Sequence, residues 1–362
     1  MTCKSMTSSR RPNPPMTSAD FAVAPRHDLS FRTVGVSAPG RLHLGFLDPS
    51  GSLGRSFGSL GVVIDGFTTE VELTASDADR LTADTPAAGA ELDRAAAHLQ
   101  RLKQRSGCHA PLSLQLRQVL PAHAGFGSGT QLASAIGRAF AKWHGLDLGT
   151  ATLAHWLGRG LRSGIGIAGF DAGGLLLDGG PGPDGLPAPL LSRIAFPPAW
   201  RIVVVQDPAH RGLSGGEEKK AIAALPPLPQ AAAAEICHQV LMRVLPAAAS
   251  AEFAPFAAGI NRMQQLLGEH FAPAQGGIFT SPAVARLMQW FADASRSGGA
   301  AIGQSSWGPT GFAVVPTEAQ AQLLVDAARA SERAAPQLEL HIVSGRNSGA
   351  AVHDRIVQPR TR

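Results

Sequence analysis

The sequence predicts an α+β protein, in which strands and helices are mixed without strict alternation. Two observations support this prediction. Short segments alternate apolar and polar residues, as half-buried strands do, and longer segments repeat apolar residues at helical spacing. The chain has 362 residues, of which 44% are hydrophobic and 16% charged. It is long enough to bury a sizeable core, and two domains are the default expectation.

The first half is expected to open with strands, one of which carries Arg41 and His43 in alternation with leucines. A turn is expected at Asp65-Gly66, and Thr150 is expected to cap a helix. The predicted elements are strands over 31–36, 37–45, 61–64 and 68–73, a helix over 90–105, a strand over 111–119, helices over 132–143 and 150–159, and a strand over 175–177.

The second half is expected to be richer in helices. Ser281 followed by Pro282 is typical of a helix start, because serine caps the helix and proline suits its first turn. A Gly/Pro-rich loop over 179–189 indicates a surface excursion near a domain boundary. The predicted elements are a strand over 202–205, alanine-rich helices over 217–271, a helix after Ser281, a strand over 312–315, a helix over 318–330 and a strand over 338–343.

A glycine-rich loop before the helix over 132–143 is the strongest functional signal. Gly125, Gly127 and Gly129 alternate with other residues, and Ser128 and Thr130 supply hydroxyls. Such a loop presents unpaired backbone N–H groups and the positive end of the helix dipole, which together suit a phosphate. The loop has neither the Gly-Lys-Ser/Thr ending of a P-loop nor the spacing of a dinucleotide fingerprint. The alternative interpretation is a tight turn without a ligand.

Composition excludes several function classes. The formal charge of +5 suits an anionic substrate, but no Lys/Arg run of the kind that binds nucleic acid is present. The three cysteines lie far apart, which gives neither a disulfide framework nor metal-ligand spacing. No apolar run has membrane-spanning length, and residues 1–30 lack the apolar core of a secretory signal. We therefore expect a cytoplasmic protein with a disordered tail over residues 1–30.

Three segments, at 38–45, 121–131 and 303–311, resemble in order and position the three motifs of the GHMP superfamily. This superfamily is named for galactokinase, homoserine kinase, mevalonate kinase and phosphomevalonate kinase. The resemblance covers the chain from about Val34 to Val343. It implies a GHMP-kinase-like two-domain fold, with a ribosomal-S5-domain-2-like N-terminal domain over 31–195 and a ferredoxin-like C-terminal domain over 196–362.

The departures from the kinase motifs resemble one non-kinase branch. This chain has Gly127-Ser-Gly-Thr-Gln131 where the kinases have Gly-Ser-Ser-Ala, and Trp307, Pro309 and Thr310 in the third motif. Together with the segments 162–167 and 212–215, these features resemble the β-ribofuranosylaminobenzene 5′-phosphate synthases. The resemblance implies that phosphoribosyl pyrophosphate (PRPP) condenses with p-aminobenzoate, or with 4-hydroxybenzoate, to give a C-riboside, pyrophosphate and carbon dioxide. It also implies a place in methanopterin biosynthesis, Mg²⁺ as the partner of the diphosphate, and a homodimer.

The expected site combines catalytic and substrate-binding residues. Asp171 has two interpretations, a catalytic group or a turn-forming residue, because an Asp near two glycines also forms turns. Arg211 and Lys219 can equally be solvated surface charges, and Trp307 can be a packing anchor. Phe126 and Trp307 are expected to hold the aromatic ring. The catalytic candidates are Asp171, Arg41, His43 and Arg162. The substrate-binding candidates are Gly125, Gly127, Ser128, Gly129, Thr130, Gln131, Arg211, Lys219, Ser305, Ser306, Trp307 and Thr310.

Two other functions remain open at this point. One is an ATP-dependent small-molecule kinase on the same fold, although the changed loops at 127–131 and 303–311 argue against it. The other is a non-catalytic ligand sensor or a subunit of a biosynthetic complex.

Overall fold

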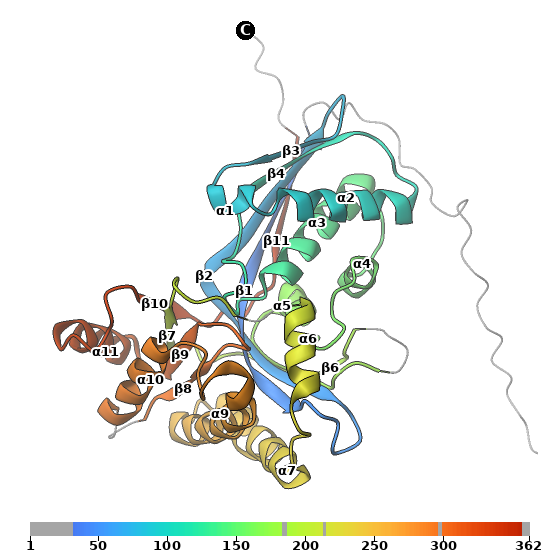
Figure 1. Ribbon diagram of the computed structural model, residues 1–362. Coiled ribbons are helices and arrows are strands. Elements are labelled where there is room, and N and C mark those ends of the chain that lie inside the picture. Colours follow the sequence, from blue (N-terminus) through green and yellow to red (C-terminus); the bar gives the residue numbers. More distant parts are fainter. Residues whose placement is uncertain (1–31, 183–186, 213–214, 296–298, 357–362) are drawn as a thin grey trace, which may run out of the picture.

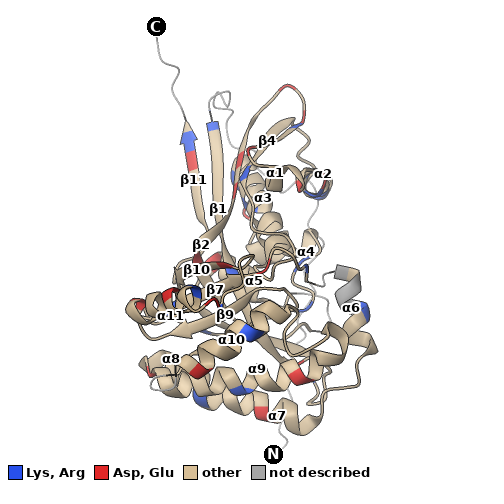
Figure 2. Cartoon of the chain, turned by 60° about the vertical axis from the view of Figure 1, so that its left-hand side comes forward, with Lys and Arg blue, Asp and Glu red and all other residues tan. Residues whose placement is uncertain are grey.

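The computed structural model describes residues 32–182, 187–212, 215–295 and 299–356. Two β-sheets with helices packed on them form an α+β structure, as the sequence predicts (Figure 1). The predicted tail over 1–30 lies outside the described residues. No helix in the described ranges has the length and apolarity needed to cross a bilayer. Figure 2 shows positive and negative residues interspersed along the outer elements.

The first sheet is seven-stranded, with the order β11-β1-β2-β4-β3, while β5 pairs with β2 and β6 with β5. Only the β3–β4 pair is parallel among the described pairings. Its strands are β1 (Arg32–Asp48), β2 (Phe57–Ala75), β3 (Arg80–Ala83), β4 (Leu112–Gln118), β5 (Leu175–Asp178), β6 (Leu190–Ile194) and β11 (Ala351–Ile356).

The two long strands β1 and β2 replace shorter predicted ones. The predicted strands 61–64 and 68–73 are one strand, so the hairpin turn at Asp65-Gly66 is wrong. Gly66 has φ +81°, and the β1–β2 register shifts between Pro39 and Arg41. The Asp-Gly pair therefore introduces an irregularity within the strand, and the chain does not reverse there. This irregularity lies opposite the start of the segment that carries Arg41 and His43.

Helices cover the first sheet on the side of α3 (Ser128–His144), which contacts both β1 and β2. Helix α2 (Leu92–Ser106) packs on α3, and both predicted helices are confirmed. Helix α4 (Thr150–Trp156) begins one residue earlier than a Thr150 cap predicts, because Gly149 is its N-cap and the Thr150 side chain bonds elsewhere. The glycine-rich run after Arg162 forms a short helix, α5 (Ile165–Ala172), and α1 spans Pro86–Gly89.

The second sheet is antiparallel, with the order β10-β7-β9-β8. Its strands are β7 (Arg201–Gln206), β8 (Ala301–Gln304), β9 (Gly311–Val315) and β10 (Glu339–Ser344). The helices of this half are α6 (Gly215–Ala224), α7 (Gln230–Gln239), the π-helix η2 (Val240–Val244), α8 (Leu245–Ser250), α9 (Phe253–Gln275), α10 (Pro282–Ala294) and α11 (Glu318–Ala330). The Ser281 cap is confirmed, since its side chain accepts a hydrogen bond from the backbone N–H of Val284.

Strand β7 shows how the second sheet is buried on both faces. Ile202 and Val204 belong to the same apolar cluster as Leu42 and Leu44 of β1, whereas Val203 and Val205 pack with α10 and α11. Alternate residues of a strand point to opposite faces. One continuous core therefore joins the two sheets beside β1, which fixes β1 against the C-terminal half.

The last strand, β11, was not predicted, and it returns the chain to the first sheet. It pairs antiparallel with β1, from Arg32 opposite Ile356 to Ser37 opposite Ala351. The guanidinium of Arg32 also binds the carboxylate of Asp354, at 2.9 Å. The domain boundary between residues 195 and 196 stays a prediction. Strand β11, from the second half of the chain, belongs to the sheet of the first half.

One buried and one half-buried histidine, His98 and His144, lie among the helices on the first sheet. His98 of α2 is 6% exposed, and burial, followed by the nearby arginines Arg159, Arg101 and Arg94, lowers its pKa to about 4. Burial likewise lowers the pKa of His144, at the end of α3, to about 4. Both side chains are therefore neutral in the folded protein above that pH.

We expect the free energy of unfolding to fall as the pH falls from 6.5 towards 4. In that window the unfolded chain binds protons at these histidines and the folded chain does not, so each group lowers stability by about 1.4 kcal/mol per pH unit. His98→Leu should remove one such contribution in urea titrations at several pH values. His155→Leu, at an exposed position of α4, is the control. An equal slope in wild type and His98→Leu would contradict the assignment.

Candidate active site

The glycine loop reaches α3 through two residues in the left-handed region. Gly125 has φ +94° and Gly127, the N-cap of α3, has φ +77°. A Cβ at Gly125 would lie 2.5 Å from the carbonyl oxygen of Ser305, and a Cβ at Gly127 would lie 2.9 Å from Cζ of Arg41. Both positions therefore require glycine, for backbone conformation and for space.

The carbonyl oxygen of Gly125 is the point at which the three sequence motifs meet. It accepts a hydrogen bond from Nη1 of Arg41 at 2.7 Å and another from Oγ of Ser305 at 2.7 Å. Ser305 Oγ in turn accepts from the backbone N–H of His43, at 2.9 Å. Residues from β1, from the glycine loop and from the β8–β9 loop are thereby held in one cluster.

A cavity of about 320 Å³ opens over the start of α3. Its walls include Gly127, Ser128 and Thr130 together with four arginines, Arg41, Arg94, Arg159 and Arg162. A second chamber of about 390 Å³ shares Arg41, Thr130, Arg159, Arg162 and Ser306 with it, so the two form one continuous site. We call this site the arginine cavity.

The arginine cavity is strongly cationic. None of the described residues that line its two chambers carries a carboxylate. Burial lowers the pKa of Arg159, and the neighbouring positive charge of Arg94 adds to this effect. His43 is 3% exposed; burial, then Arg41 and Arg162, lower its pKa to about 3. The imidazole is therefore neutral, and the charge of the cavity comes from guanidinium groups.

The lining residues do not fit a protein-held Mg²⁺ ion. This cation prefers carboxylate and other oxygen ligands, whereas the cavity offers arginines, two hydroxyls on α3 and backbone N–H groups. In the parts of the chain that the structure describes, no three His, Cys, Asp or Glu side chains are grouped as metal ligands. Among the described lining residues, the positive charges that can neutralise an anion belong to the arginines.

Most of the predicted site residues lie together. The backbone of the glycine loop and the start of α3 face the arginine cavity, as the phosphate hypothesis requires. Ser306 has φ +56° and lines both chambers, while Trp307 closes one wall. The predicted residues that line the cavity are Arg41, His43, Gly125, Gly127, Ser128, Gly129, Thr130, Arg162, Ser306 and Trp307.

Asp171 does not belong to this group. It is exposed near the end of α5 and accepts a hydrogen bond of 2.5 Å from the hydroxyl of Thr150. That hydroxyl also accepts from Nη2 of Arg138, at 2.7 Å. Gly166, near the other end of α5, is the part of this helix that lines the cavity. The helix therefore directs Asp171 away from the cavity and into a structural contact with α4.

Several other candidates are structural or lie elsewhere. Gln131 is fully buried and donates from Nε2 to the carbonyl of Gly166, which ties α3 to α5. Phe126 is buried and stacks on Phe67, with ring centroids 4.5 Å apart. It does not line the arginine cavity, where it was expected to hold the aromatic ring of the substrate. Ser305 and Thr310 are buried within the β8–β9 loop. Arg211 lines a separate cavity beside Asp207, and the Lys219 side chain lies outside the described residues.

Sequence reasoning missed two arginines of the cavity. Arg159 follows α4, flanked by Gly158 and Gly160, which also line the second chamber; this glycine-flanked basic run was an available signal. Arg94 lies on α2, where it forms an ion pair with Glu91 at 2.8 Å. Its position on the polar side of a helix resembles that of any solvated charge, so no local signal distinguishes it.

Comparison with known proteins supports the fold and the motif assignment. The family described as GHMP kinases N terminal domain matches residues 92–174, and GHMP kinases C terminal matches residues 244–334. Mevalonate diphosphate decarboxylase from Staphylococcus aureus has a similar structure, with a TM-score of 0.67 at 14% identity, over 90% of this chain and 100% of that chain. Homoserine kinase from Cytophaga hutchinsonii has a TM-score of 0.63 at 17% identity, over 92% and 100%. The predicted GHMP-kinase-like fold is confirmed.

Curated relatives narrow the family. The β-ribofuranosylphenol 5′-phosphate synthase of Archaeoglobus fulgidus is 31% identical over 78% of this chain and 87% of that relative. The protein of the same name from Methanothermobacter thermautotrophicus is 29% identical over 77% and 88%. The non-kinase branch indicated by the loops at 127–131 and 303–311 is confirmed: the chain belongs to the β-ribofuranosylphenol 5′-phosphate synthase family of the GHMP superfamily.

Proposed function

We propose that this chain condenses PRPP with a 4-substituted benzoate, 4-hydroxybenzoate or p-aminobenzoate, in methanopterin biosynthesis. The products are a C-riboside 5′-phosphate, pyrophosphate and carbon dioxide. The relatives are named for a β-ribofuranosylphenol product, and a phenol is the group that 4-hydroxybenzoate would leave on the product. The assay below therefore uses both acids.

The observation that best supports this proposal is the arginine cavity at the phosphate loop. PRPP carries a diphosphate and a 5′-phosphate, so its site must neutralise several negative charges. Four guanidinium groups surround the start of α3, where backbone N–H groups and the helix dipole also favour an anion. Arginine suits this task because its planar fork binds phosphate in a bidentate way.

The chemistry then follows from charge. As the bond from C1 of the ribose to the diphosphate breaks, its electron pair leaves with pyrophosphate, and the arginines stabilise that developing charge. The ring carbon that bears the carboxylate forms a bond to C1. The bond from that carbon to the carboxylate then breaks, its electron pair restores the aromatic ring, and carbon dioxide leaves. This route needs no nucleophilic side chain of the protein.

Mg²⁺ stays a proposal as the partner of the diphosphate. Because the cavity offers no carboxylate among its described lining residues, the ion would enter with PRPP and would not be held by the protein alone. The homodimer also stays a proposal, supported by the family resemblance.

The kinase alternative is less well supported. A kinase of this superfamily is expected to place an Asp beside the phosphate site, and here Asp171 is exposed and bonded to Thr150. The non-catalytic alternative differs from both enzymes in that a sensor or complex subunit would release no product in an assay of turnover.

A single assay tests the proposed reaction. Purified protein is mixed with PRPP, Mg²⁺ and either acid carrying a labelled carboxyl group, and labelled carbon dioxide and pyrophosphate are measured. We expect both products in equal amounts. Phosphate transfer from ATP to an alcohol would support the kinase instead, and a folded protein that releases neither product with either acid would contradict the synthase.

Gly127→Ala should raise the KM for PRPP by about tenfold or more, the effect of losing roughly 1.4 kcal/mol. The new Cβ would displace the guanidinium of Arg41. Gly145→Ala is a matched control. Gly145 ends the same helix with φ +66°, and a Cβ there meets nothing within 4 Å. Both variants carry a similar backbone strain, so a KM that rises equally in both would remove Gly127 from the substrate site.

Arg159→Ala should raise the KM for PRPP by about 10- to 100-fold, because a hydrogen bond to a charged group contributes roughly 1.5–3 kcal/mol. Arg101→Ala removes the same charge from an exposed position of α2 that does not line the cavity. Steady-state kinetics at two salt concentrations separate a direct contact from the effect of net charge. Equal changes in the two variants would show that Arg159 acts only through the general field.

A further inference from the structure

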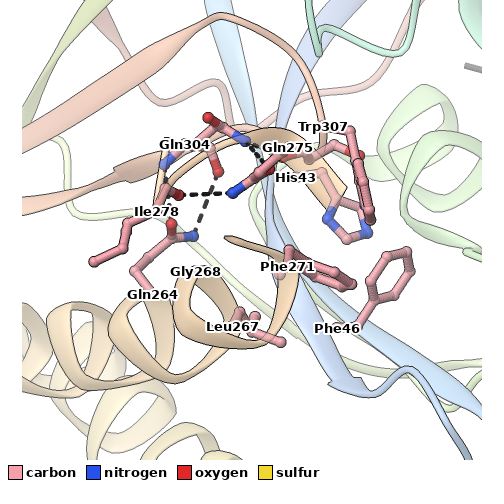
Figure 3. Close-up of a pocket in the computed structure, with 12 residues that line it drawn as sticks. His43, Phe46, Gln264, Leu267, Gly268, Phe271, Gln275, Ile278, Gln304 and Trp307 are labelled. Atoms are coloured by element: carbon pink, nitrogen blue, oxygen red, sulfur yellow. Dashed lines mark hydrogen bonds between the residues drawn. The ribbon is translucent and has the colours of Figure 1, made fainter. Parts of the chain in front are cut away.

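A small side pocket opens from the arginine cavity beside His43. Its volume is about 30 Å³. His43, Phe46 and Ser306 also line the second chamber of the arginine cavity, so the two spaces adjoin. Figure 3 shows Phe46, Phe271 and Trp307 around the imidazole, with Leu267 of α9 on the far wall. The pocket lies where β1, α9 and the β8–β9 loop meet.

Hydrogen bonds hold the polar walls of this pocket in place. Gln264 donates to the carbonyl of Leu44 at 2.5 Å and accepts from the backbone N–H of Gln304 at 2.9 Å. Gln304 donates to the amide oxygen of Gln275 at 3.2 Å and accepts from the backbone N–H of Thr280 at 2.6 Å. The glutamines drawn in Figure 3 therefore use their amides on one another and on the backbone. They frame the pocket, and their amides are already occupied.

Unused hydrogen-bonding capacity belongs to two other side chains. Both ring nitrogens of His43 and the indole Nε1 of Trp307 are buried and have no hydrogen-bond partner among the described residues. His43 is 3% and Trp307 2% exposed. A buried polar atom without a partner costs free energy, so such atoms in a pocket indicate a missing polar group.

The size of the pocket limits what that group can be. About 30 Å³ has room for a group the size of a water molecule, such as a hydroxyl or an amino group. It does not have room for a six-membered ring, which would stay at the mouth between Phe46, Trp307 and the arginine cavity. Close packing fixes the floor, since a Cβ on Gly45 would lie 2.5 Å from Cδ1 of Leu267.

The proposed reaction sets the orientation of the ring. The carbon that bears the carboxylate must face C1 of PRPP, which lies with the diphosphate in the arginine cavity. The 4-position is diametrically opposite on the ring, so its substituent points away from that cavity. We propose that the side pocket receives the 4-hydroxyl or 4-amino group of the aromatic acid, bonded by His43 and Trp307, and restricts that substituent to the size of a water molecule. This inference rests on the proposed function.

Neutral His43 suits this role. One imidazole nitrogen accepts a hydrogen bond and the other donates one, so the side chain can accept from the 4-substituent. That bond leaves more electron density on the ring and favours attack by the opposite carbon on C1. A protonated imidazole would only donate, and burial beside Arg41 and Arg162 keeps the pKa of His43 at about 3.

A variant of the pocket floor tests the size limit. Wild type should use p-aminobenzoate at least 100-fold better, in kcat/KM, than 4-(methylamino)benzoate, which keeps one N–H and adds one methyl group. Leu267→Ala should lower this preference at least tenfold by making room for the methyl group. Leu287→Ala, in α10, makes a similar cavity in a different core cluster that does not line the site, and it should keep the wild-type preference. An unchanged preference in Leu267→Ala, or a wild type that uses both acids equally, would overturn the proposal.

A binding measurement separates this inference from the proposed function. In ¹⁵N-labelled protein, the indole N–H signal of Trp307, identified by its loss in Trp307→Phe, should shift on addition of 4-hydroxybenzoate and less on addition of benzoate. A shift without turnover would contradict the proposed reaction and leave the pocket assignment standing. Turnover without a shift would contradict the pocket assignment alone. Absence of both would contradict both.

Discussion

The carbonyl oxygen of Gly125 is the contact on which the rest of the site depends. It accepts from Arg41 of β1 and from Ser305 of the β8–β9 loop, so three segments that are far apart in the sequence share one atom. It helps to orient the guanidinium of Arg41 and to hold the glycine loop against the loop that joins two strands of the second sheet. The glycines at 125 and 127 are needed because their neighbours approach to 2.5 and 2.9 Å of where a Cβ would be.

The arginine cavity is an arrangement that favours an anion over water. Its four guanidinium groups repel each other, although Glu91 pairs with one of them, Arg94. Burial adds to the cost, as the lowered pKa of Arg159 indicates. A ligand with several negative charges relieves this repulsion, so substrate binding and local order are coupled. The side pocket supplies a different, uncharged environment within the same site: aromatic side chains, hydrogen-bonded glutamines, a neutral imidazole and room for one small polar group. The arginine cavity suits the phosphates of PRPP, and the side pocket suits the 4-substituent of the aromatic acid.

Local patterns carried most of what the sequence predicts correctly. The glycine loop, α3 and the Ser281 cap depend on neighbours within a few residues, and each agrees with the structure. Arg41 and His43 lie in a strand as predicted, although that strand is longer than predicted. Asp171 does not line the cavity, and its placement depends on the direction of α5 and on Thr150, twenty-one residues away. Arg94 and β11 were missed because their significance arises only from contacts with distant segments. The fold could be inferred from motifs in order, whereas the cavity walls required three-dimensional packing.

The pairing of β11 with β1 also constrains how the protein is made. Arg32 and Asp354 are 322 positions apart in the chain, so the edge of the first sheet beside β1 stays open until residues 351–356 have been synthesised. At typical synthesis rates of about 5–20 residues per second, this wait is roughly 16–64 s. During that time the Arg32–Ser37 end of β1 has a free edge, and such edges invite pairing with other chains. Strand β11, which lines neither chamber of the arginine cavity, thus decides when this edge of the nascent first sheet is protected from association.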